Sequence, residues 1–183
     1  RYLSSAASDV YKRQCLTSRE GNNMEIIIRP TLVSDAAAMC EIFSQPKAQR
    51  ETLQLPMPSV AMWTQRLENI PTGVYSFVAE LDGKVVGNIG FEHSQRPRTA
   101  HRGTFGLAVH DDYHGMGIAS KLIETVLDLA DNWLQIKRVH LEVNTDNGAA
   151  IACYKKFGFE IEGEAKNAVC LLYTSPSPRD QLT

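Results

Sequence analysis

The sequence predicts one domain of the mixed α/β class. Two apolar runs, 74–81 and 84–91, meet at Asp82-Gly83, which is the strongest short signal for a β-hairpin in the chain. A third strand-like run, 102–109, leads through a glycine turn into a long stretch whose apolar residues recur at helical spacing. Strands and helices that alternate in this way are typical of a sheet covered by helices.

One strand and two helices are expected before the hairpin. The Ile-rich run 25–29 is stopped by a proline, and a helix begins near Ser34. A loop is expected at 45–58, and its segment 52–58 mixes apolar side chains with two prolines, so we expect a semi-rigid flap there. A second helix begins at the N-cap Ser59 and ends before Pro71. The side chains expected to face the core from these helices are Ala38, Met39 or Cys40, Phe43, Met62, Trp63 and Leu67.

The elements after the hairpin alternate between strand and helix. A polar, basic link, 93–101, leads into the strand 102–109. The expected elements that follow are a helix ending at Trp133, a strand 139–143, a helix 148–157 ended by Gly158, and a strand 159–165. The core-facing positions of the long helix are Ile118, Leu122, Val126, Leu129, Ala130 and Trp133.

Composition excludes several classes of protein. Residues 24–169 carry 14 basic and 18 acidic side chains, a net charge of −4, so no nucleic-acid partner is expected. No apolar window is long enough to cross a membrane. Cys40 and Cys153 lack metal-type spacing, so we expect no metal and a cytoplasmic location.

Both ends of the chain are predicted to lie outside the natural domain. Codons for Asp9–Gln14, read on the opposite strand and shifted by one base, encode the sequence of Cys170–Ser175. A sequencing adapter translated from both strands explains this relation better than natural disordered tails do. The expected division is a non-native, adapter-derived leader 1–23, a natural start at Met24, a C-terminally truncated domain 24–169 and an adapter-derived tail 170–183.

The turn with Gly115 and Gly117 stands between a strand and a helix. The first N–H groups of a helix have no partner within it, and they lie at the positive end of its dipole, so such a turn can hold an anion. Met116 and Ile118 stand where a nucleotidase would need its lysine and hydroxyl, and the third glycine of a dinucleotide fingerprint is missing. A turn of this kind can equally be plain structure, so the spacing alone leaves phosphate binding open.

Two motifs together resemble the GNAT superfamily of N-acetyltransferases. The run His114–Ala119 is similar to its pyrophosphate loop, Gln/Arg-x-x-Gly-x-Gly/Ala, with His114 in the Gln/Arg position. The run Asn147–Phe159 fills every named position of Asn-x-x-Ala-x-x-x-Tyr-x-x-x-Gly-Phe. The chain further resembles the bacterial YhhY-type subgroup, which acetylates amino acid amines, at Thr52-Leu53-Gln54, Pro56, Pro58, Met62-Trp63, Gln95–Arg98, Asp131–Leu134 and Tyr154–Lys156.

The resemblance implies a GNAT fold and an acetyltransferase activity. The central sheet would be predominantly antiparallel, with splayed fourth and fifth strands at 102–109 and 139–143 and helices on its flanks. The last strand of the family would be missing here or replaced by artefact sequence such as the apolar run 168–173. The implied reaction transfers the acetyl group of acetyl-CoA, a co-substrate, to a primary amine by direct attack in a ternary complex. The implied acceptor is the α-amino group of an amino acid or aminoacyl compound.

The family pattern also implies roles for single residues. Tyr154 would protonate the departing thiolate, although a tyrosine before Gly-Phe can also be a packing aromatic. The residues implied to bind the cofactor are Leu107 and Val109 of the fourth strand, His114, Gly115, Met116, Gly117, Ile118 and Ala119 of the turn, and Asn147 on the pantetheine arm.

Several alternatives stay open from the sequence. The general base is one of Glu92, His93, His101, His110 and Asp111, or a relayed water. Arg96 and Arg98 either pair with a substrate carboxylate or are exposed charge, and Lys155 and Lys156 either attract cofactor phosphates or solvate a helix. The acceptor could instead be a polyamine, an aminoglycoside or a protein N-terminus, and a CoA-binding module without turnover is the alternative of another class. A homodimer is left open.

Overall fold

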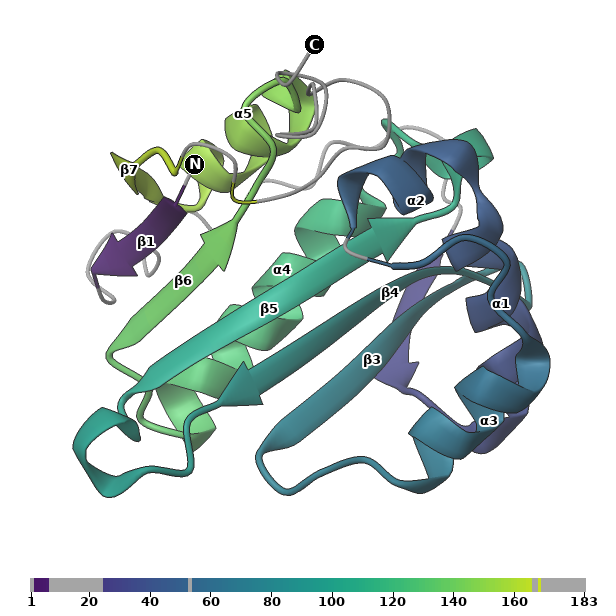
Figure 1. The fold of residues 1–183 in the computed structure, drawn as a ribbon, viewed down its shortest axis with the longest axis horizontal. Helices are drawn as coiled ribbons and strands as arrows, with labels where there is room; N and C mark the ends of the chain where they lie inside the picture. Colours follow the sequence, from purple (N-terminus) through teal and green to yellow (C-terminus); the bar gives the residue numbers. More distant parts are fainter. Residues whose placement is uncertain (1, 7–24, 53, 166–167, 169–183) are drawn as a thin grey trace, which may run out of the picture.

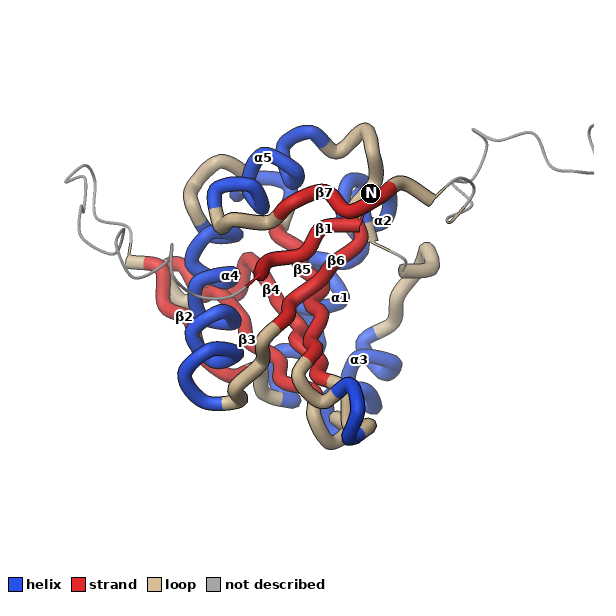
Figure 2. Tube along the Cα trace, turned by 90° about the vertical axis from the view of Figure 1, so that its left-hand side faces the viewer, coloured by secondary structure: helices blue, strands red, loops and turns tan. Residues whose placement is uncertain are grey.

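The computed structural model describes residues 2–6, 25–52, 54–165 and 168. Within these residues, seven strands form one sheet in the order β2-β3-β4-β5-β6-β1-β7, and helices cover both of its faces (Figures 1 and 2). The strands are β1 (Tyr2–Ala6), β2 (Ile26–Pro30), β3 (Val74–Leu81), β4 (Lys84–His93), β5 (Arg102–Val109), β6 (Arg138–Glu142) and β7 (Glu160–Gly163).

The helices begin and end where short local signals place them. Ser59 caps its helix as predicted, since its Oγ accepts the N–H of Met62 at 3.1 Å. Gly158 ends the last helix with a φ of +79°. The α-helices are α1 (Ala36–Ser44), α2 (Pro46–Glu51), α3 (Val60–Glu68), α4 (Ile118–Asp128) and α5 (Gly148–Lys156), and a π-helical turn, Leu129–Trp133, follows α4.

The sheet is mostly antiparallel, as predicted. Strands β2, β3, β4 and β5 pair antiparallel with one another in that order. The predicted hairpin joins β3 to β4 through Asp82 and Gly83, whose φ angles are +49° and +79°. Strand β5 pairs parallel with β6. The sheet is therefore mixed.

The strand beside β7 comes from the N-terminal end of the chain. Strand β1 lies between β6 and β7 and pairs antiparallel with both (Figure 2). Sequence reasoning left residues 1–23 out of the fold and named 168–173 as an occupant of this place. Residues 2–6 hold it instead, and 169–173 lie outside the described residues.

Each face of the sheet carries its own apolar cluster. Strand β5 shows how the two are separated, because successive side chains of a strand point to opposite faces. Phe105 packs into the cluster beneath α4, whereas Ala108 belongs to the cluster beneath α1 and α3. Figure 2 shows α4 on one side of the sheet and α1 and α3 on the other.

Two local predictions were wrong. The loop expected at 45–58 contains helix α2, which begins with Pro46 at its first position, where a missing N–H costs nothing. Trp133, expected in the core, is 75% exposed, because the π-helical turn shifts the helical register after Asp128. Leu55 and Met57 of the expected flap are 84% and 92% exposed. Leu53 lies outside the described residues.

Candidate active site

Strands β5 and β6 separate along the middle of the sheet. Their parallel pairing covers only Arg102–Thr104 on β5 and Arg138–His140 on β6. Beyond Thr104, β5 continues to Val109 without a partner on that side among the described residues, and Figure 1 shows the two ribbons diverging. The predicted splay of these strands is confirmed.

Leu107 and Val109 direct their backbone groups into this gap. The N–H of His110 bonds to the carbonyl of Val86 on β4 at 2.8 Å, so the even-numbered residues of β5 face β4. The N–H and C=O groups of Leu107 and Val109 therefore point the other way, toward β6. This is the orientation that the predicted contact with pantetheine requires.

The glycine turn closes one end of the gap. Gly115 and Gly117 have φ angles of +80° and +82°, which glycine adopts without strain, and Gly117 is the N-cap of α4. A Cβ atom added at either glycine would meet nothing within 4 Å. The first N–H of α4 with a backbone partner is that of Lys121, which bonds to the carbonyl of Gly117. The N–H groups of Ile118, Ala119 and Ser120 have no acceptor among the described residues, so the turn offers donors to an anion.

His114 holds the start of the turn against β5. Its Nε2 lies 3.0 Å from the carbonyl oxygen of Val109, a distance at which a protonated Nε2 donates a hydrogen bond. The imidazole therefore hydrogen-bonds to the carbonyl of Val109, one of the backbone groups that face the gap. Met116 is half-buried against the core, and the Ile118 side chain is buried. Only the backbone of these two residues would therefore be available to a cofactor.

Asn147 has two partners within the protein. Its Oδ1 accepts the N–H of Ala150 at 3.0 Å and caps α5, and its Nδ2 donates to Oε2 of Glu51 at 2.9 Å. Asn144 donates to the same carboxylate oxygen at 3.3 Å. Sequence reasoning missed Glu51 and Asn144, because α2 and the loop after β6 lie far apart in the chain. The predicted bond of Asn147 to pantetheine would use what remains of its side chain.

Tyr154 is buried between aromatic rings. Its ring centroid lies 5.8 Å from that of Phe105 and 6.0 Å from that of Phe159. Burial raises the pKa of the Tyr154 phenol above its ordinary value, so the phenol stays protonated across the physiological range. The side chain thus combines the packing role with a proton available for donation.

The candidate bases are scattered over the structure. His110 is buried, its Nδ1 accepts the N–H of Asp112 at 3.3 Å, and its Nε2 lies 3.2 Å from Nε2 of Gln45 and 3.4 Å from Oε1 of Glu41. His93 stacks on Tyr75. The other candidates are Asp111, half-buried near His114, His101, exposed before β5, and Glu92, which lines a pocket. The structure does not bring these five together.

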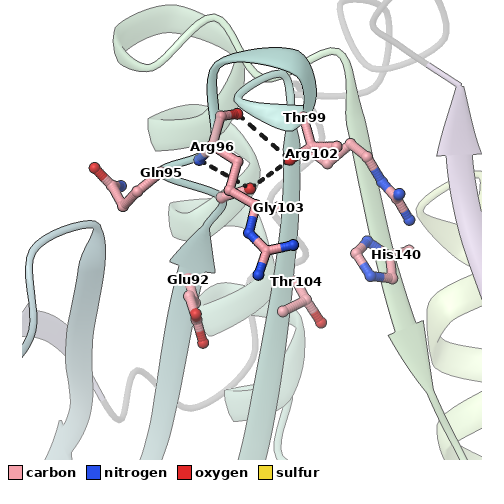
Figure 3. Close-up of a pocket in the computed structure, with 9 residues that line it drawn as sticks. Glu92, Gln95, Arg96, Thr99, Arg102, Gly103, Thr104 and His140 are labelled. Carbon is pink, nitrogen blue, oxygen red and sulfur yellow. Dashed lines mark hydrogen bonds between the residues drawn. The ribbon is translucent and has the colours of Figure 1, made fainter.

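A pocket of about 530 Å³ lies where β5 and β6 are still paired. Of the two arginines named from the sequence, Arg96 lines this pocket and Arg98 does not. Glu92, named from the sequence as a candidate base, also lines it, but sequence reasoning missed several polar side chains of the wall, because their strands are joined only in the folded sheet. Among these are Arg102, Thr104 and His140 (Figure 3).

The part of the chain that the structure describes contains neither a metal-binding cluster nor a membrane-spanning helix. No three His, Cys, Asp or Glu side chains there lie close enough to hold a metal ion. No helix there is long and apolar enough to cross a membrane. Lys155 and Lys156 are exposed on the last turn of α5.

Comparison with known proteins agrees with this geometry. Residues 37–159 match the model of the acetyltransferase (GNAT) family. The chain is 43% identical over 142 residues to the L-amino acid N-acetyltransferase AaaT of Escherichia coli K12, covering 78% of this chain and 87% of that protein. It is 31% identical over 88 residues to the spermidine N(1)-acetyltransferase of the same organism, covering 48% of this chain and 46% of that protein.

The fold has solved counterparts. The crystal structure of an acetyltransferase of the GNAT family from Streptococcus pneumoniae superposes with a TM-score of 0.71 at 25% identity, covering 82% of this chain and 94% of that one. The family match spans more than half of the chain, including the splayed strands, the glycine turn and α5. This chain therefore belongs to the GNAT family and is an N-acetyltransferase, an enzyme that transfers an acetyl group to an amine.

Proposed function

We propose that the protein transfers the acetyl group of acetyl-CoA to the α-amino group of a free amino acid. One observation carries the cofactor half of this proposal: the unpaired N–H groups of the turn and the backbone of Leu107 and Val109 converge on the gap between β5 and β6. The acceptor half is supported by the 43% identical relative, which is an L-amino acid N-acetyltransferase.

Groups of this chain would bind the cofactor, and most of them are backbone N–H groups that face its negatively charged diphosphate. The N–H groups of residues 115–119 would hold the diphosphate, where the open space over Gly115 and Gly117 lets it approach closely. The N–H of Leu107 would face the thioester oxygen and stabilise the negative charge that develops there. Asn147 would bond the pantetheine arm from the start of α5.

The reaction then needs two proton movements. The amine nitrogen forms a bond to the acetyl carbon, and the bond from that carbon to sulfur breaks. The acceptor attacks as the neutral amine, and its nitrogen then gives up one proton to water, from which Tyr154 regains the proton that it donates. The Tyr154 phenol, which its burial keeps protonated, would return a proton to the sulfur.

An acceptor panel tests the proposal. The full chain is incubated with acetyl-CoA and, in turn, the twenty L-amino acids, spermidine, an aminoglycoside and a peptide with a free N-terminus, and the release of the CoA thiol is followed. We expect the highest kcat/KM with one or more amino acids. Preference for spermidine would favour the activity of the 31% identical relative. Binding of CoA without thiol release for any amine would overturn the proposed turnover.

The proposed cellular compartment is supported by the free cysteine thiols. Cys40 and Cys153 are both free of disulfides. Free thiols are typical of a reducing compartment, so we place the enzyme in the bacterial cytoplasm.

A further inference from the structure

The face of the sheet beneath α1 and α3 has an open strip on β4 and β5. Gly90 and Gly106 lie directly opposite each other in this pair, and a Cβ atom on either would meet nothing within 4 Å. Gly106 shares its face with Ala108, whose side chain packs under α1 and α3, because the two are separated by two positions. The strip therefore exposes main chain without side chains. It lies at the edge of the gap into which the backbone N–H and C=O groups of Leu107 point.

The 530 Å³ pocket continues this strip toward the start of β5. The next pair on the same face of the two strands is Glu92 with Thr104, and both residues line the pocket. Figure 3 shows the guanidinium of Arg96 reaching over the strands beside Gly103 and Thr104, and that of Arg102 lying beside His140. The wall thus holds two guanidinium groups and one carboxylate. This set of charges complements a zwitterion that carries one carboxylate and one amino group.

Neither arginine is neutralised within the described part of the chain. No carboxylate lies within ion-pair distance of Arg96 or Arg102, whereas Arg29 elsewhere in the sheet bonds to both Asp35 and Glu80. Two nitrogens of the pocket wall, Nε of Arg102 and Nδ1 of His140, are buried without a hydrogen-bond partner. Buried polar atoms are usually paired, so these two nitrogens show that the polar groups of the wall are not all satisfied within the described part of the chain.

The loop that carries Arg96 is held in place. The hydroxyls of Ser94 and Thr99 are 2.6 Å apart, and the N–H of Thr99 donates to the carbonyl of Arg96 at 2.9 Å. The N–H of Ser94 donates to the carbonyl of Arg102 at 3.0 Å, which ties the loop to β5. The backbone therefore presents both guanidinium groups to one pocket before a ligand arrives.

We propose that Arg96 and Arg102 bind the α-carboxylate of the acceptor and so make the enzyme selective for amino acids over other amines. A carboxylate bound by the Arg96 guanidinium would lie over Gly103 and Thr104, two to three residues before Gly106 on the same strand. The adjacent α-amino group would then be directed along β5 toward Gly106 and the edge of the gap where Leu107 turns its N–H. The inference rests on the proposed function and adds to it the residues that recognise the substrate.

Paired acceptors test this inference. The amino acid with the highest kcat/KM is compared with its own α-carboxamide, which keeps the amine and the side chain but lacks the carboxylate. Arg96→Gln and Arg102→Gln should each raise KM for the amino acid at least 10-fold and leave KM for the carboxamide within about 2-fold, because a charge-assisted bond is lost only with the acid. Arg98→Gln is the matched control, since Arg98 belongs to the same loop but does not line the pocket.

The outcomes separate the two proposals. Arg96 is exposed, so its variant tests recognition even if the half-buried Arg102 variant folds poorly, and the melting temperature is recorded for each. Equal losses with the acid and the carboxamide, or no loss in the Arg96 variant, would overturn the carboxylate site while the proposed function stands. A wild-type enzyme that acetylates other amines but no amino acid would overturn both.

Discussion

At the scale of single residues, Tyr154 packs in the core through its ring and is proposed to donate a proton through its hydroxyl. The hydroxyl can be removed while the ring is kept. Tyr154→Phe keeps the contacts with Phe105 and Phe159 but takes away the proton proposed for the sulfur. We expect kcat to fall by about 100-fold, the scale of general acid catalysis, with KM for acetyl-CoA and the melting temperature nearly unchanged. Steady-state kinetics and a thermal melt measure both. An undiminished kcat would assign Tyr154 to packing alone.

Asp35 is a residue whose charge stabilises the fold. It is 7% exposed, and its two oxygens accept hydrogen bonds from Arg29 at 2.8 and 3.0 Å, while the N–H of Leu32 donates to it at 2.8 Å. Arg29, and to a lesser degree the Leu32 N–H, hold the pKa of the Asp35 carboxyl below its ordinary value of 3.8. Asp35→Asn should lower the free energy of unfolding at pH 7 by about 2 kcal/mol, as expected for bonds to a charged group.

The pH dependence of this stabilisation has a definite sign. A lowered pKa in the folded state contributes stability that is fully present above the unfolded value, near pH 4, and is lost as the pH falls through the folded value. Urea unfolding of the wild type and of Asp35→Asn should therefore differ by a constant amount above pH 5 and converge below pH 4. A difference that grows toward low pH would contradict the assignment.

At the scale of elements, the turn before α4 can be tested against an equivalent glycine. Gly117 and Gly83 both have φ near +80° and open space around them, so Ala costs about 1 kcal/mol of backbone strain at either. Only Gly117→Ala places a methyl group where the diphosphate is proposed to lie. We expect KM for acetyl-CoA to rise at least 10-fold in Gly117→Ala and to stay unchanged in Gly83→Ala. Similar values in the two variants would remove the turn from the cofactor site.

The start of α5 carries a cap and a proposed cofactor contact in one side chain. Asn147→Ser keeps an N-cap oxygen, whereas Asn147→Ala loses it and should destabilise the protein by about 1 kcal/mol. Both variants lose the amide that contacts Glu51 and that we propose for pantetheine. A raised KM for acetyl-CoA in both, with normal melting in Asn147→Ser alone, is the expected result. If KM follows stability, Asn147 is a cap and nothing more.

The elements themselves could be predicted where local chemistry decides them. Ser59, Asp82-Gly83 and Gly158 mark their boundaries through one side chain or one backbone angle, and these predictions are confirmed. The π-helical turn that carries Trp133 outward has no such marker, because it depends on backbone bonds five residues apart, such as that from the N–H of Leu134 to the carbonyl of Leu129. The helical spacing of apolar residues in the sequence continues through this turn, and it therefore predicts wrongly that Trp133 faces the core.

At the scale of the whole molecule, the sequence predicts more of the proposed cofactor site than of the proposed acceptor site. The turn 114–119 and the adjacent strand are one continuous stretch of sequence, so their geometry follows from local order. The pocket wall takes Glu92, Arg102 and His140 from three strands, and only the sheet brings these side chains together. Arg96 and Arg98 are indistinguishable in sequence, and the fold alone separates the one that lines the pocket.

The sheet also depends on a strand that sequence reasoning set aside. Ser4 of β1 lies opposite His140 of β6 and Glu160 of β7, so its backbone belongs to the ladder that joins them. Ser4→Pro removes one N–H donor from that ladder and should lower the free energy of unfolding by about 1 to 3 kcal/mol, since a carbonyl is left unpaired. Ser4→Thr, which keeps the N–H and favours strands, is the control and should melt like the wild type. Equal melting of the proline variant and the wild type would show that β6 and β7 are stable without β1.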